Sequence, residues 1–419
     1  MQTIKMTPLE NGLRVITDAV DSVDSIALGV WIGSGSRYEN KNNNGAAHMV
    51  EHMLFKGTET RDAQQIVSDI ESVGGQMNAY TSRDITSYHM HLMADHTSIA
   101  MDVLSDMVLR STLRDEEVER ERKVIIQEIG MTMDTPDDLV FDLAQETAYH
   151  DQSFGRSILG QVSNIEAMSR DMLVDFIDKQ YTPNNMVLSA AGKVDHNEFV
   201  AMARDMFGDM SIKPRTDYQP AKYNGGDHRE AKELEQTHVV MGFEGVSRDN
   251  DDYYAAQMLG AILGGGMSSR LFQEVRELRG LAYSVYAYHA ASSDTGQFGI
   301  YAGTDPTKSD ELIHVLCEQA KSLTSTISES EISRARHQMK SSLAMSRESM
   351  MTRANGQAKY LLQRDKILDQ RDILQQIDAV EAADISRIAD RIFSTVPALT
   401  TLGDISNVTQ YDRVVDKMR

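Results

Sequence analysis

The residues best suited to chemistry lie in one short segment, residues 45–58, which reads Gly-Ala-Ala-His-Met-Val-Glu-His-Met-Leu-Phe-Lys-Gly-Thr. Within it, His48, Glu51 and His52 form the pattern H-x-x-E-H. Positions i, i+3 and i+4 share one face of a helix, so the two imidazoles can bind one metal ion. The carboxylate beside them can then reach a water molecule on that metal. The pattern is the inverted form of H-E-x-x-H and predicts a metal-dependent hydrolase.

The alternative for these two histidines is an ordinary surface helix. Apolar residues surround them on every side of the helix, however, which predicts that the helix is largely buried. Buried histidine and glutamate side chains need partners. A bound metal is therefore the simpler interpretation.

A third metal ligand is expected from the charged helical segment 116–130. A catalytic zinc site usually has three protein ligands and one open position. No cysteine lies near, so His, Asp or Glu must supply the ligand. Glu121 and Glu128 share one helix face, and Glu128 has isoleucine neighbours, which makes its carboxylate anomalous without a cation. The other acids of the segment are interpreted as a solvated face: Glu116, Glu117 and Glu119.

The elements that must position these residues occur twice along the chain. A polar segment with two prolines and a Gly-Gly pair lies near the midpoint and is typical of a linker. On each side, a β-rich stretch, a helix, a strand pair, long helices and a final strand follow in the same order. We therefore expect an α+β fold of two homologous domains, each a mostly antiparallel sheet packed with helices. The predicted boundaries are 1–212 for the metal-binding domain, 213–230 for the linker and 231–419 for the second domain.

Composition excludes several function classes. The 419 residues carry a formal charge of −21, which argues against nucleic-acid and anionic-membrane surfaces. The single cysteine, Cys317, lies in an apolar helical stretch and is expected to be a buried structural thiol. No apolar segment is long enough for a membrane span, and the start of the chain has no export signal, so we expect a bacterial cytoplasmic location.

The motif and the spacing of the later acids resemble the pitrilysin-type (M16) zinc metallopeptidases, especially the subfamily of the catalytic β subunit of the mitochondrial processing peptidase and its bacterial relatives. The resemblance covers nearly the whole chain and includes residues 33–39, 52–58 and 155–160. It implies one Zn²⁺ per chain, held by His48, His52 and Glu128. It also implies that Glu51 is the general base and Glu121 a carboxylate supporting the ligands.

Two further matches concern substrate binding. Asn78 and Ala79 match the edge strand beside the zinc, on which the family holds substrate as an added β-strand. Arg276 and Tyr283, from the second half, match an Arg/Tyr pair that binds substrate carbonyls and helps to stabilise the oxyanion. Without the resemblance, Asn78 and Ala79 fit an ordinary strand, and Arg276 fits a salt bridge with a neighbouring glutamate.

The resemblance also gives an expectation about specificity. Asp138 and Asp142 match an acidic pair that receives an arginine near the cleavage site, although aspartates at a helix start are often only capping residues. We therefore expect an endopeptidase for extended or unfolded, basic peptides, working as a homodimer.

Two alternatives from the same fold and one from another class stay open. The first is a non-catalytic partner or respiratory-complex core subunit, although such chains lose motif residues that are present here. The second is a glycine-loop recognition subunit, which the short loop 263–269 disfavours. A nucleic-acid-binding module has no basic patch to support it.

Overall fold

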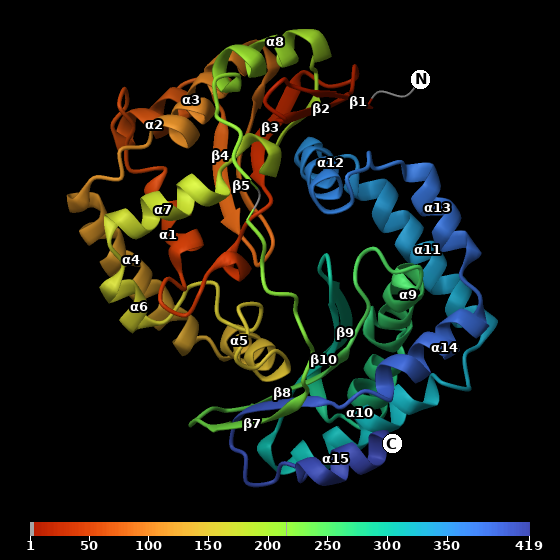
Figure 1. Cartoon of the computed structure of the whole chain (residues 1–419). Helices are drawn as coiled ribbons and strands as arrows, with labels where there is room; N and C mark the ends of the chain where they lie inside the picture. Colours follow the sequence, from red (N-terminus) through yellow and green to blue (C-terminus); the bar gives the residue numbers. More distant parts are fainter. Residues whose placement is uncertain (1–3, 215) are drawn as a thin grey trace. The chain divides into compact units, whose positions relative to one another are not determined.

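The computed structural model describes residues 4–214 and 216–419 and divides the chain into two compact units (Figure 1). Unit 1 contains residues 1–130, 157–219 and 344–368. Unit 2 contains residues 131–156, 220–343 and 369–419. Each unit is therefore assembled from both halves of the sequence.

Unit 1 is built on a sheet of six strands among the described residues, in the order β1-β2-β6-β3-β5-β4. All neighbouring strands are antiparallel except β2 and β6, which are parallel. The strands are β1 (Ile4–Pro8), β2 (Arg14–Ala19), β3 (Ser25–Ile32), β4 (Gln76–Thr81), β5 (Thr86–Met93) and β6 (Met186–Gly192). Its helices are α1 (Ala46–Met53), α2 (Ala63–Glu71), α3 (Thr97–Arg110), α4 (Asp115–Asp134, which continues into unit 2), α6 (Val162–Ala167), α7 (Arg170–Gln180), α8 (His196–Phe207) and α12 (Met350–Arg364).

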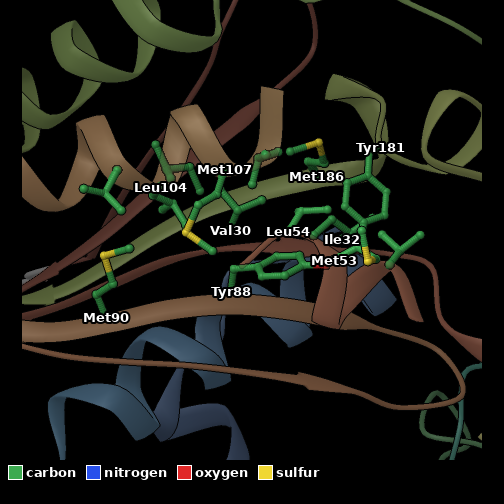
Figure 2. Packing of buried hydrophobic residues seen from close by; sticks show 14 of the residues in the cluster. Val30, Ile32, Met53, Leu54, Tyr88, Met90, Leu104, Met107, Tyr181 and Met186 are labelled. Atoms are coloured by element: carbon green, nitrogen blue, oxygen red, sulfur yellow. The ribbon is translucent and has the colours of Figure 1, made fainter. Parts of the chain in front are cut away.

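The two faces of this sheet are covered by helices from different parts of the sequence. Alternate residues of β3, such as Leu28 and Val30, belong to the main core together with residues of α1, α3 and α8. Figure 2 shows Val30 and Ile32 of β3 in this core with Leu104 and Met107 of α3. The intervening residues, such as Ala27 and Trp31, pack against α12 instead. Because both faces are covered, β3 reads as a continuous buried run from Ile26 to Ile32.

Unit 2 has a sheet of five strands among the described residues, in the order β7-β11-β8-β10-β9. The strands are β7 (Gly226–Ala231), β8 (Thr237–Glu244), β9 (Ala282–Ala291), β10 (Gly296–Thr304) and β11 (Ala398–Gly403). The helices are α5 (Pro136–Ala148), α9 (Tyr253–Gly264), α10 (Ser309–Ser322), α11 (Glu329–Ser346, which ends in unit 1), α13 (Gln370–Ala379), α14 (Ala382–Phe393) and α15 (Tyr411–Met418). Helix α5 packs on one face, where Val140 and Ala144 contact Val240 and Leu402.

The expected fold class is confirmed, since each unit has a mostly antiparallel sheet packed with helices. The units differ from the expected sequence halves in two ways. Residues 226–230, placed in the linker from their polarity, belong to the edge strand β7, which runs from Gly226 to Ala231. Helix α5 comes from the first half of the sequence but packs on the sheet of unit 2. Helix α12 comes from the second half but packs on the sheet of unit 1, so the two helices are exchanged between the sequence halves.

Two further expectations concern the single cysteine and membrane-spanning helices. Cys317 is a free thiol and is buried, as expected, and burial raises its pKa to about 11. Among the described residues, no helix is both long and apolar enough to cross a membrane.

Candidate metal centre

Helix α1 presents the H-x-x-E-H residues from the core of unit 1. Six of its eight residues are buried, including His48, which is 7% exposed. Glu51 and His52 are half-buried on the same side of the helix. The apolar remainder anchors the helix in the main core, where Met53 and Leu54 lie near Tyr88 (Figure 2).

His48, His52 and Glu128 come together as the sequence predicts. One ligand atom from each lies within 4.8 Å of the others. Nε2 of His48 is 3.7 Å from Oε1 of Glu128, and Nε2 of His52 is 3.7 Å from Oε2 of the same carboxylate. Two imidazole nitrogens and a carboxylate converging on one point form a donor set suited to zinc.

The carboxylate of Glu121 orients the His52 ring. Its Oε2 lies 3.0 Å from Nδ1 of His52, and its Oε1 lies 2.7 Å from Nζ of Lys56. Burial raises the pKa of Glu121, but the hydrogen bonds with His52 and Lys56 outweigh this and leave the pKa lowered. An ionised Glu121 that accepts from Nδ1–H leaves Nε2 of His52 free to bind a metal.

The electrostatics of His48 fit the same role. Burial, together with the neighbouring His52, lowers the pKa of His48 to about 3. The ring is therefore neutral, which is the form that binds metals. Its buried Nδ1 has no hydrogen-bond partner among the described residues. Burial lowers the pKa of His52, but the hydrogen bond with Glu121 and the charges of Glu121, Glu128 and Glu51 outweigh it and leave the pKa raised.

Glu51 is held apart from the three converging ligands. Its Oε2 accepts a 2.5 Å hydrogen bond from the Thr81 hydroxyl. Burial raises the pKa of Glu51, and the Thr81 hydrogen bond and His52 only partly oppose this. A carboxylate with a raised pKa is suited to exchanging protons near neutral pH.

Asn78 and Ala79 lie on β4, at the end of the sheet order in unit 1. Among the described residues, β4 pairs with β5 alone, so its other edge has backbone groups available for an added strand. The Asn78 side chain accepts a hydrogen bond from the Ala79 backbone N–H over 2.8 Å. Thr81, the partner of Glu51, ends this strand.

The remaining predicted site residues belong to unit 2. The guanidinium carbon of Arg276 lies 4.2 Å from the ring centroid of Tyr283, whose side chain is 73% exposed. Nε of Arg276 is also 3.7 Å from Glu277, as the alternative interpretation predicts. Asp138 and Asp142 are one turn apart on α5, the first exposed and the second half-buried.

Glu128 joins the predicted cluster, but it is more exposed than its sequence neighbours suggest. The isoleucine neighbours of Glu128 predict a buried carboxylate, yet its side chain is 40% exposed. Helix α4 is amphipathic, with Ile125 and Ile129 buried and Glu128 facing the two histidines instead of the core. Glu116 and Glu119 are exposed, as expected for a solvated face. Glu117 is not: its side chain is 16% exposed and pairs with Arg120.

Comparison with known proteins places the chain in a family. Residues 14–162 match the family model "Insulinase (Peptidase family M16)", and residues 167–339 match "Peptidase M16 inactive domain". The chain belongs to peptidase family M16, a family of metallopeptidases.

Several relatives extend over nearly the full length. An uncharacterized zinc protease of Rickettsia felis is 37% identical over 96% of this chain and 98% of its own. One of Bacillus subtilis is 36% identical over 97% of this chain and 99% of its own. These similarities support zinc as the metal.

Two solved structures share the fold. A protease from Helicobacter pylori aligns with a TM-score of 0.90 at 22% identity, and the alignment covers 96% of this chain and 100% of the Helicobacter chain. A chain of complex III2 from Candida albicans aligns with a TM-score of 0.88 at 21% identity, covering 99% of each. At these identities the likeness shows the fold alone.

Proposed function

We propose that this chain is a zinc-dependent endopeptidase with one metal site, in unit 1. The observation that carries the proposal is the convergence of His48, His52 and Glu128 within 4.8 Å, with Glu51 on the same helix face as both histidines. A non-catalytic subunit needs no such donor set. The fold shared with a complex III2 chain is compatible with that alternative, but the complete set of chemical residues favours an enzyme.

The proposed chemistry is hydrolysis of a peptide bond by water. A zinc ion held by His48, His52 and Glu128 would lower the pKa of a bound water and polarise the substrate carbonyl. Glu51 takes the proton from the attacking water and then delivers it to the leaving amine. The Thr81 hydroxyl holds one oxygen of Glu51, which leaves the other for proton transfer. Arg276 and Tyr283 are proposed to bind substrate carbonyls and to stabilise the developing negative charge.

The proposed substrate is an extended or unfolded basic peptide. The edge of β4 that pairs with no other described strand, at Asn78 and Ala79, supports binding of the substrate as an added strand. Asp138 and Asp142 are proposed to receive an arginine side chain of the peptide. The net charge of −21 would also attract basic peptides over a longer range. We further propose a homodimer that acts in the bacterial cytoplasm.

The test uses Glu51→Gln, which keeps the shape of the side chain but removes the base. Wild-type protein should contain about one zinc per chain and cleave an unstructured basic peptide. Glu51→Gln should keep the zinc and lose activity by at least about 100-fold. Glu116→Gln, at an exposed position of α4, is the matched control and should retain full activity. Zinc-loaded wild type that cleaves no unstructured peptide would favour the non-catalytic alternative.

A further inference from the structure

The start of the metal-binding helix is capped from outside the helix. Helix α1 begins after Gly45, which has φ 98 and no side chain with which to cap the first turn. The first backbone N–H groups of a helix have no partner within it. His48 lies in this first turn, so whatever satisfies those N–H groups also fixes the backbone that carries a metal ligand.

Glu39 supplies the missing acceptors. Its Oε1 accepts a 2.7 Å hydrogen bond from the backbone N–H of Ala47. Its Oε2 accepts 2.9 Å hydrogen bonds from the backbone N–H of Gly45 and from the side-chain amide of Asn44. The residue is 4% exposed. A buried carboxylate is costly unless it is fully hydrogen-bonded, and here the positive end of the helix dipole also stabilises it.

The segment that carries Glu39 is tied to the turn between β4 and β5. Backbone N–H groups of Ser36 and Arg37 donate to the carbonyls of Ser82 and Arg83, each over 3.1 Å. The Arg37 guanidinium also contacts Asp84 at 2.7 Å. The fit is tight, because a Cβ added at Gly35 would lie 2.0 Å from the Ser82 carbonyl oxygen.

The capping residue therefore connects two parts of the site. The turn 82–85 directly follows Thr81, the hydroxyl partner of Glu51. Helices α7 and α8 of the same unit are capped by the residue immediately before them, Ser169 and Asp195, which fixes no distant segment. The cap of α1 instead sets the register of its first turn against the β4–β5 turn.

From these contacts we propose that Glu39 is a positioning residue of the metal site. Its carboxylate holds the first turn of α1 so that His48 points at Glu128 and His52. The inference rests on the proposed function, in which these three side chains bind zinc. Replacing the carboxylate by an amide would place an NH₂ group against donors, which the first turn could accommodate only by moving.

The experiment compares Glu39→Gln with Asp195→Ala, which removes the local cap of α8 in the same unit. Zinc affinity is measured by competition with a chromophoric chelator, and thermal unfolding is followed on the metal-free proteins. Glu39→Gln should weaken zinc binding about 10- to 100-fold, the range typical for loss of a group that orients metal ligands. Asp195→Ala should lower the unfolding midpoint and leave zinc affinity unchanged.

The outcomes separate this inference from the proposed function. Equal zinc affinity of wild type and Glu39→Gln, or equal weakening by Asp195→Ala, overturns the positioning role and leaves the metal site intact. Absence of zinc binding by wild type overturns both. If Glu39→Gln does not fold, Glu39→Asp keeps the charge and shortens its reach. A folded Glu39→Asp with weakened zinc binding supports the role, and one with wild-type affinity contradicts it.

Discussion

The hydroxyl of Thr81 donates a 2.5 Å hydrogen bond to Oε2 of Glu51, which links the last residue of β4 to the proposed general base. Thr81→Val keeps the shape of the side chain and removes the donor. We expect kcat to fall about 10-fold or more with zinc content unchanged, because the carboxylate loses its fixed orientation. Thr81→Ser should restore most of the activity. Steady-state kinetics with metal analysis check this, and an unchanged kcat in Thr81→Val would contradict it.

Lys56 should support the metal site through Glu121. The ammonium lies 2.7 Å from Oε1 of Glu121, whose other oxygen binds His52. Lys56→Met removes the positive charge that stabilises the buried Glu121 carboxylate. Glu121 should then orient His52 less well, so we expect zinc affinity to fall about 10-fold. Lys56→Arg should recover it, and Lys123→Met, at an exposed position of α4, should have no effect. Chelator competition measures all three, and equal affinity of Lys56→Met and wild type would argue against this support.

Metal removal should destabilise the chain measurably. Zinc bound only by the folded state adds RT ln(1 + [L]/Kd), which is about 2.7 kcal/mol at a free zinc concentration 100 times the Kd. A chelator should therefore lower the thermal midpoint of wild type. His52→Ala, which removes one ligand, should show little shift with zinc or chelator. Differential scanning calorimetry provides the test, and a full zinc-dependent shift in His52→Ala would exclude this residue as a ligand.

Acid should destabilise unit 2 through a buried histidine far in sequence from the metal ligands. Burial lowers the pKa of His289 to about 4, and its Nε2 accepts a hydrogen bond from the Val246 backbone N–H over 3.1 Å. Its pKa in the unfolded chain is about 6.5. Between these values the unfolded state binds more protons, so stability is complete above about pH 6.5 and falls as the pH drops towards 4.

Protonation of His289 should lower the free energy of unfolding by at most about 3 kcal/mol. His289→Gln removes the titrating ring, so its urea-unfolding free energy should depend less steeply on pH between 6.5 and 4. His150→Gln, at an exposed position of the same unit, is the control and should keep the wild-type slope. Identical slopes for His289→Gln and wild type would show that His289 does not titrate in this way.

The acidic pair on α5 should set the preference for arginine. Asp138→Asn and Asp142→Asn together should lower kcat/KM for an arginine-containing peptide about 10-fold or more. The same peptide with its arginine replaced by alanine should be cleaved about equally by wild type and by the double variant. Glu146→Gln, exposed on the same helix, is the control. If the double variant lost the same factor on both peptides, the pair would not recognise arginine.

Much of the site could be predicted because its chemistry is local in sequence. His48, Glu51 and His52 need only helical spacing, and the helix indeed runs from Ala46 to Met53. Strand β3, Ser25–Ile32, is also readable from sequence, because its apolar run is bounded by polar and glycine residues. Helical spacing places both Glu121 and Glu128 on one face of α4, and only the resemblance to M16 peptidases indicates Glu128 as the ligand; its 40% exposed side chain is not what its isoleucine neighbours suggest.

The contacts that support the site could not be predicted, because they join residues far apart in the chain. Thr81 and Lys56 carry no signal of their own, and their roles follow only from where β4 and α4 lie in unit 1. The exchange of α5 and α12 was also missed. An amphipathic helix shows which of its sides is apolar, but the sequence does not say which sheet that side covers.

The exchange of α12 has a consequence for synthesis on the ribosome. All six strands of the first sheet have been made once Gly192 emerges, but α12, which buries Trp31 and Ala191, begins only at Met350. One apolar face of the nascent sheet therefore stays without its covering helix, exposed or bound by a chaperone, until nearly the whole polypeptide has been translated.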